Sequence, residues 1–144
     1  MTQPALTGAR KGAFVAYRWA LLVFLVLGVV QIFLAGTGVF SLHGREIGTA
    51  GETAFSPHRA VGFTMSAVSL VILILALVAR PGNRHLIGAA VLFVLTGFAQ
   101  SLFAGLGDNT AFFGGLHALD GVAVIGLAGF LHASTIRQAK AEQG

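Results

Sequence analysis

The sequence has 144 residues, of which 56% are hydrophobic and only 10% are charged, and its formal net charge is +4. Soluble domains carry about a quarter charged residues, so this composition excludes most soluble enzyme folds and predicts a protein that lives in lipid. The chain has no cysteine, which excludes disulfides, iron-sulfur clusters, thiolate zinc sites and covalently attached c-type haem.

Four apolar stretches, at about residues 19–40, 60–79, 85–106 and 116–136, are each long enough to cross a bilayer. Because lipid offers no partner for backbone N–H and C=O groups, each stretch is predicted to be a helix. The short turn at residues 80–84 makes the second and third helices antiparallel neighbours. We therefore predict an all-α, polytopic membrane protein that forms an up-down four-helix transmembrane bundle.

Basic residues divide the chain into a cytoplasmic N-terminal segment over residues 1–18, a transmembrane domain over 19–136 and a cytoplasmic tail over 137–144. The N-terminal segment is predicted to be partly disordered, with a short interfacial helix over residues 10–18. Seven basic residues fall on one predicted side, namely Arg10, Lys11, Arg18, Arg80, Arg84, Arg137 and Lys140, and Arg45 and Arg59 fall on the other. The positive-inside rule then predicts a multi-pass protein of the bacterial plasma membrane with both termini in the cytoplasm. This sorting explains the basic excess without a nucleic-acid partner.

Small residues along the predicted helices suggest where the helices approach one another, because membrane helices pack closely through glycine and alanine. The candidates are Ala35, Gly36, Gly88, Gly97, Ala104, Gly105, Gly126 and Gly129.

Two segments of the sequence repeat in the same order. Residues 31–38 match residues 100–107, with Gln31 aligned to Gln100, and residues 58–62 match residues 117–121. The first pair ends the odd-numbered helices, and the second pair opens the even-numbered ones. The bundle is therefore predicted to consist of two tandem helical hairpins related by a pseudo-two-fold axis along the membrane normal.

The repeat places His58 and His117 on diagonal helices at matching depth, near the outer boundary of the bilayer. Two facing neutral imidazoles are the axial ligands that a b-type haem needs, and such a haem requires neither cysteine nor a loop motif. Gly62 and Gly121 follow the histidines by one turn on the same face, which would leave room for the porphyrin edge. The alternative is that each histidine is an ordinary satisfied or solvated residue at a helix start.

Three further polar side chains border this predicted site. The buried amides of Gln31 and Gln100 need partners, which can be the histidines or groups on a neighbouring helix. Asp120 lies one turn inside the membrane from His117, where a carboxyl group is costly. It is predicted to pair with Arg59 across helices, to bond a histidine or to stay protonated for proton handling.

The remaining histidines are predicted to have no role in this site. His43 falls in the outer loop and His85 beside the basic inner turn, so both are expected to be surface residues. His132 lies 15 residues after His117, about 60° around the helix from it. A second, inner haem between His85 and His132 is the remaining alternative.

Together these motifs resemble one four-helix half of the haem A synthase type of membrane protein. The resemblance spans roughly residues 19–136 and rests on the Gln-x-x-x-Ala/Gly-Gly endings of the odd helices, on His58-Arg59 and on Leu116-His117. It implies that His58 and His117 are haem ligands.

The chain has one bundle where those enzymes have two, lacks their outer-loop cysteines, and has Phe55 in place of a glutamate. Their oxidative chemistry is therefore not carried over. The chain is also similar to small bacterial four-helix membrane proteins of unknown activity.

The leading hypothesis is a membrane b-type haem protein that serves electron transfer or haem handling and is not an independent enzyme. One alternative is a non-enzymatic accessory subunit, whose glycine-rich faces bind another membrane protein or a second copy of the chain. A small transporter is the last alternative, because the first three helices contain no acidic residue.

Overall fold

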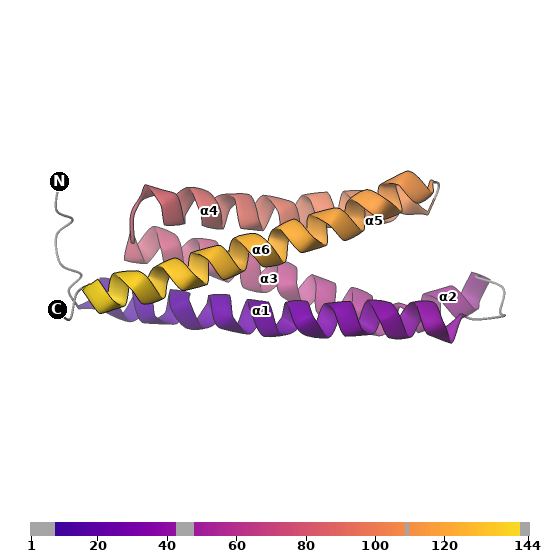
Figure 1. The fold of residues 1–144 in the computed structure, drawn as a ribbon, viewed down its shortest axis with the longest axis horizontal. Coiled ribbons are helices and arrows are strands. Elements are labelled where there is room, and N and C mark those ends of the chain that lie inside the picture. The colour runs from indigo at the N-terminus through magenta and orange to yellow at the C-terminus, as the bar shows by residue number, and fades with distance from the viewer. Residues whose placement is uncertain (1–7, 43–47, 109, 142–144) are drawn as a thin grey trace.

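The computed structural model describes residues 8–42, 48–108 and 110–141, and every regular element in them is helical (Figure 1). The elements are α1 (Ala9–Ser41), α2 (Gly48–Ala54), α3 (Ser56–Ala79), α4 (Asn83–Val94), a π-helical turn η1 (Leu95–Ala99), α5 (Gln100–Gly107) and α6 (Ala111–Ala141). Helix α4, η1 and α5 follow one another without a break, so they form one rod.

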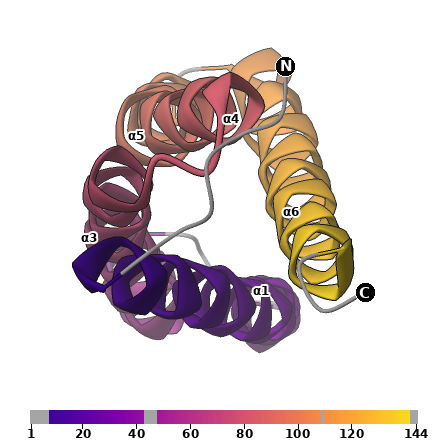
Figure 2. The ribbon, with the colours of Figure 1, turned by 90° about the vertical axis from the view of Figure 1, so that its left-hand side faces the viewer.

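Four rods are long and apolar enough to cross a membrane: α1, α3, the α4–η1–α5 rod and α6. The chain is therefore a multi-pass membrane protein with the predicted up-down four-helix bundle. Viewed along the bundle, the rods surround its axis in chain order, so α3 lies diagonally opposite α6 (Figure 2). The short α2, in the connection between α1 and α3, was not predicted.

Two helices extend beyond the predicted membrane spans. Residues 10–18 form the first turns of α1 and not a separate interfacial helix. The reason is a buried stripe at alternating spacings of three and four, which runs through Phe14, Tyr17, Leu21 and Phe24 and continues across the predicted boundary. Helix α6 begins before residue 116 and continues to Ala141, so most of the predicted tail is helical. The disorder predicted at the N-terminus falls largely on residues 1–7, outside the described residues.

The centre of the bundle is packed with apolar side chains. Leu21, Phe24, Ile72, Leu92 and Leu131 are fully buried there.

The small residues have different roles in the structure. A Cβ atom added to Gly88 would lie 2.7 Å from Leu131 Cδ2, so the close contact of α4 with α6 requires glycine there. A Cβ atom added to Gly36, Gly105 or Gly126 would meet no described atom within 4 Å. The predicted helix contacts at these three glycines are wrong within the described residues, because the residues lie on open surface.

The two ends of the bundle differ. The start of α1, the turn between α3 and α4 and the end of α6 lie at one end, which we call the basic end (Figure 1). There Arg10 donates hydrogen bonds to the carbonyl oxygens of Ala79 at 3.3 Å and Arg80 at 3.4 Å, which caps the end of α3. The other end carries α2, and we call it the α2 end.

Towards the α2 end the two hairpins diverge (Figure 1). Helix α5 contacts α6 and η1, and among the described residues it contacts neither α1 nor α3. The α1–α3 hairpin and the α5–α6 hairpin are therefore separate walls at this end of the bundle.

Candidate functional site

His58 and His117 lie between these two walls. His58 is in the first turn of α3 and His117 is in the second turn of α6. Their ring centroids are 6.1 Å apart, and the ring planes cross at 66°. The pairing across the bundle that the repeat predicts is confirmed by this geometry. Both rings are only partly buried.

Two hydrogen bonds fix His58 to α1. The Gln31 amide Nε2 donates to the backbone oxygen of His58 at 2.9 Å, and His58 Nδ1 lies 3.3 Å from the backbone oxygen of Gln31. The ring of Phe55 stands edge-on to the imidazole with centroids 6.2 Å apart. A Cβ atom added to Gly38 would lie 2.7 Å from the Phe55 ring, so a glycine on α1 makes room for this aromatic neighbour.

The same pair of bonds occurs in the second hairpin. The Gln100 amide Nε2 donates to the backbone oxygen of His117 at 3.0 Å, and His117 Nδ1 lies 3.1 Å from the backbone oxygen of Gln100. The π-helical turn η1 directly precedes Gln100. Such turns insert one extra residue into a helix and are frequent at functional sites.

These contacts determine which ring nitrogen carries the proton. A backbone carbonyl oxygen can only accept a hydrogen bond, so Nδ1 of both His58 and His117 must be the donor. In the neutral imidazole, Nε2 then carries a free lone pair. Neither Nε2 has a hydrogen-bond partner among residues 8–42, 48–108 and 110–141. The site therefore presents two imidazole lone pairs, one from each hairpin.

The two glycines that follow the histidines lie beside the glutamine amides. A Cβ atom added to Gly62 would lie 3.1 Å from Gln31 Nε2, and one added to Gly121 would lie 3.5 Å from Gln100 Nε2. The predicted role of these glycines, space for a porphyrin edge, stays a prediction. Each hairpin thus uses one glutamine, one histidine and one glycine as a unit.

Asp120 is buried beside this unit, with 8% of its surface exposed, and its carboxyl group lies beside the Gln100 side chain. Its Oδ2 atom is buried and has no hydrogen-bond partner in the described part of the chain, and the same holds for Gln31 Oε1. Arg59 is exposed and donates to the backbone oxygen of Glu52. The ion pair predicted between Asp120 and Arg59 is therefore wrong: the arginine bonds the backbone of α2.

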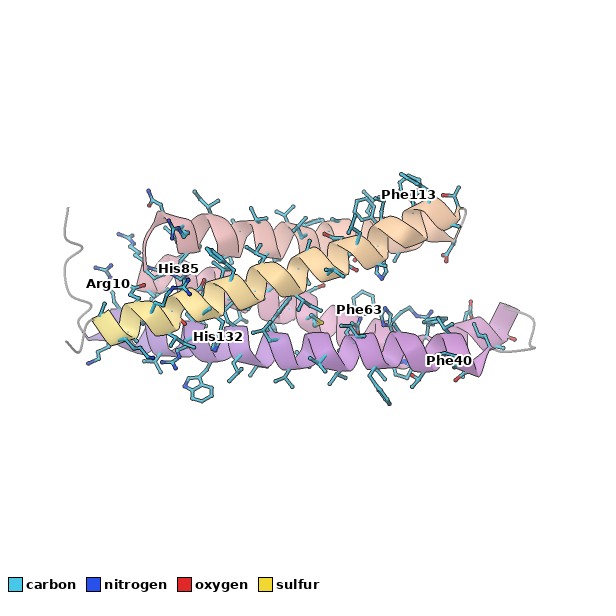
Figure 3. All side chains as sticks on the ribbon, in the orientation of Figure 1. Arg10, Phe40, Phe63, His85, Phe113 and His132 are labelled. Atoms are coloured by element: carbon cyan, nitrogen blue, oxygen red, sulfur yellow. The ribbon has the colours of Figure 1, made fainter. Side chains whose placement is uncertain are left out.

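A second polar cluster lies towards the basic end, where Figure 3 labels His85, His132 and Arg10. His85 is only 6% exposed, so the prediction that it is a surface residue is wrong. Its Nδ1 lies 3.3 Å from the Tyr17 hydroxyl and its Nε2 lies 3.2 Å from Ser134 Oγ. Both ring nitrogens therefore have partners.

His132 does not complete a second histidine pair. Its Nδ1 bonds the backbone oxygen of Arg18 at 3.2 Å, on α1, whereas His85 bonds two hydroxyl groups. Because the two histidines bond to different groups, these contacts do not support the alternative of an inner haem. His43 falls outside the described residues.

Sequence reasoning missed Tyr17 and Ser134 as partners of His85. One signal was present for Tyr17, the one tyrosine of the chain, which stands on the buried stripe three residues after Phe14. Nothing in the sequence marks Ser134.

Comparison with known proteins gives one match. Residues 31–105 match a family described as "Family of unknown function (DUF6220)". This segment includes Gln31, His58 and Gln100 and ends before His117. No curated protein and no solved structure matches the chain.

Proposed function

We propose that this chain, which belongs to the family of unknown function DUF6220, is a membrane b-type haem protein with His58 and His117 as the two axial ligands. The proposal agrees with the implied resemblance to one half of the haem A synthase type of protein. It rests mainly on the geometry of the two histidines and their glutamine partners.

The observation that carries the proposal is the orientation of the two imidazoles. Metal-bound histidines almost always donate their other ring N–H to a carboxylate, a backbone carbonyl or water, which fixes the tautomer and the ring. His58 and His117 both do so through Nδ1 to a glutamine backbone oxygen. In both hairpins a reciprocal bond from the glutamine amide to the histidine backbone accompanies this contact.

The spacing of the rings also fits one metal ion between them. An imidazole nitrogen lies about 2 Å from a bound metal such as zinc, so two nitrogens on opposite sides of one metal are about 4 Å apart. Ring centroids lie slightly beyond the nitrogens, and the observed centroid separation is 6.1 Å.

The surroundings suit a flat, largely apolar group. At the α2 end, helix α5 has no described contact with α1 or α3. Apolar side chains are exposed at this end, including Phe63, of which 72% is exposed, and Leu119. A porphyrin inserted between the walls would cover apolar surface on both hairpins.

The donor set favours electron transfer over catalysis. Bound through His58 and His117, the group would supply one-electron chemistry, and both of its protein-held ligand positions would be filled by histidine. His58 and His117 would hold the group from opposite hairpins, and the glutamine backbone oxygens would keep both imidazoles in the ligating tautomer. We therefore assign no independent enzyme activity to the chain.

Titration of the purified protein with haem tests this proposal by absorption spectroscopy. We expect a Soret band that saturates at one haem per chain. The double variant His58→Ala/His117→Ala should lose the band, whereas His132→Ala, which changes a histidine in the other half of the bundle, should keep it. A band of equal intensity in the double variant would overturn the assignment.

We further infer that the basic end faces the cytoplasm of a bacterial cell and that the membrane is the plasma membrane. Seven basic residues at this end support the orientation. They are Arg10, Lys11 and Arg18 at the start of α1, Arg80 and Arg84 at the turn between α3 and α4, and Arg137 and Lys140 at the end of α6. The histidine pair would then lie towards the outer face.

A second candidate function is an accessory subunit of a membrane complex or a homo-oligomer. The open surfaces at Gly36, Gly105 and Gly126 favour it, because outward glycines allow another helix to approach closely. This candidate predicts an assembly larger than one chain in mild detergent and no haem band. A stable isolated monomer would contradict it.

A further inference from the structure

A pocket opens at the basic end, at the opposite end of the bundle from the histidine pair. It has a volume of about 580 Å³ and lies between the turn that joins α3 to α4 and the last turns of α6. Sites for small molecules span roughly 300–1,000 Å³, so the pocket can hold a group of that size. The proposed haem site uses none of its residues.

Several of the side chains that line the pocket can donate hydrogen bonds. Arg84 and Asn83 line it from the start of α4, and Arg137, Gln138 and Ser134 line it from α6. No acidic residue is among the lining residues in the described part of the chain. Two guanidinium groups without a lining carboxylate select an anion, and guanidinium geometry suits the oxygens of a phosphate group.

The backbone adds to this preference. Helix α4 begins at Asn83, and its N-cap residue Gly82 provides no side-chain hydrogen bond. The first N–H groups of a helix lack partners within the helix, and the helix dipole makes this end partly positive. The N-terminus of α4 therefore faces the same pocket as the two arginines. Its backbone N–H groups add to the positive potential that the arginine side chains provide.

Other groups nearby are engaged elsewhere. Arg10 donates to the carbonyl oxygens of Ala79 and Arg80, at the end of α3. His85 lines the inner wall of the pocket, but Tyr17 and Ser134 occupy both of its ring nitrogens. Arg84 and Arg137, both exposed, are therefore the cationic groups available to a ligand in the pocket.

The position of the pocket identifies the source of the phosphate. Both arginines stand at the ends of membrane-crossing rods, Arg84 in the first turn of α4 and Arg137 in the last turns of α6. The ends of membrane-crossing helices lie near the phospholipid headgroups, and basic pockets between such helices on the cytoplasmic side bind anionic headgroups. We propose that this pocket binds the phosphate group of an anionic phospholipid through Arg84, Arg137 and the N-terminus of α4.

A bound headgroup would connect two rods. Arg84 belongs to the α4 rod and Arg137 to α6, and these rods already meet at the close contact of Gly88 with Leu131. A phosphate shared by the two arginines would stabilise this contact from the membrane surface. The inference is independent of haem and rests on the orientation inferred under the proposed function.

Lipid binding to the purified full chain in detergent tests the proposal, with native mass spectrometry as the readout. The probes are dioleoylphosphatidylglycerol, dioleoylphosphatidylcholine and inorganic phosphate. We expect the wild-type chain to retain one phosphatidylglycerol in preference to phosphatidylcholine. The Arg84→Gln/Arg137→Gln variant should bind phosphatidylglycerol about tenfold more weakly or worse.

A matched control removes two charges from the same end but outside the pocket. Lys11→Gln/Lys140→Gln changes two exposed lysines that do not line it, and should retain the lipid nearly as well as wild type. Gln138→Glu provides a second test within the pocket, because it adds a negative charge to a partly exposed site and should weaken binding. It also keeps the proposal falsifiable if the double arginine variant fails to fold.

Three results would overturn the proposal. Equal weakening in the lysine and arginine variants would indicate general electrostatic attraction and not a site. Equal retention of phosphatidylcholine and phosphatidylglycerol by the wild-type chain would contradict selection of an anionic headgroup. Displacement of the lipid by inorganic phosphate at equal concentration would make the ligand a soluble phosphate compound.

Discussion

Gln31 and His58 hold each other by two hydrogen bonds that run in opposite directions. The Gln31 amide donates to the His58 backbone oxygen at 2.9 Å, and His58 Nδ1 donates to the Gln31 backbone oxygen at 3.3 Å. Gln100 and His117 repeat both bonds in the second hairpin. One relationship thus fixes the packing of two helices and the tautomer of a histidine, and the chain contains it twice.

Replacing either glutamine should loosen its own hairpin. Gln31→Ala and Gln100→Ala each remove one hydrogen bond between helices, and each should lower the free energy of unfolding by about 1 kcal/mol. Because the two bonds lie in different hairpins, the effects should be nearly additive in the double variant. Denaturant titration in detergent micelles measures this. Ser101→Ala is the control, since Ser101 is exposed and bonds only Gly97 in its own rod; equal loss in the control would contradict the prediction.

The two glycines of the repeat should respond differently to alanine. At Gly62 the new Cβ would stand 3.1 Å from Gln31 Nε2, so the amide must move, whereas at Gly121 the separation from Gln100 Nε2 is an ordinary 3.5 Å. Alanine gains up to about 1 kcal/mol over glycine inside a helix. Gly121→Ala should therefore be neutral or stabilising, and Gly62→Ala should be the less stable variant by about 1 kcal/mol. Thermal unfolding of both variants measures this difference. If Gly121→Ala were the less stable variant, contact with the glutamine amide would not explain the glycine at position 62.

Tyr17→Phe tests the polar cluster towards the basic end. The substitution keeps the buried ring and removes the hydroxyl that lies 3.3 Å from His85 Nδ1. Because His85 is buried, its nitrogen would lose a partner that water does not easily replace, at a cost of about 1–3 kcal/mol. Differential scanning calorimetry should show a lower unfolding temperature. Trp19→Phe, at an exposed position two residues along α1, serves as the comparison and should change little.

Much of the fold follows from the sequence because the bilayer leaves few choices. Four apolar stretches had to become helices, and the short turn before Asn83 had to make two of them antiparallel. The early start of α1 was missed because the segments were divided by charge. The buried stripe from Phe14 to Phe24 has helical spacing throughout, and it continues past the charged residues.

The site was predictable only in part. The duplicated motif was enough to bring His58 and His117 together. The hydrogen-bond partners of the histidines could not be predicted, because the acceptors are the backbone oxygens of Gln31 and Gln100. Every residue has a backbone oxygen, so the sequence does not mark these two. The burial of His85 was missed for a related reason: its partners, Tyr17 and Ser134, come from two other helices at no fixed spacing.

The central claim is that His58 and His117 both bind haem. It is tested most directly by measuring the spin state of the haem iron in the variant His58→Gly. Low-temperature electron paramagnetic resonance of the ferric wild-type protein should give a low-spin signal, as two axial imidazoles require. The glycine variant should give a high-spin signal, and added free imidazole should restore the low-spin one by entering the space left by the side chain. His117→Gly should behave in the same way. A low-spin signal that both variants retain without added imidazole would contradict the account.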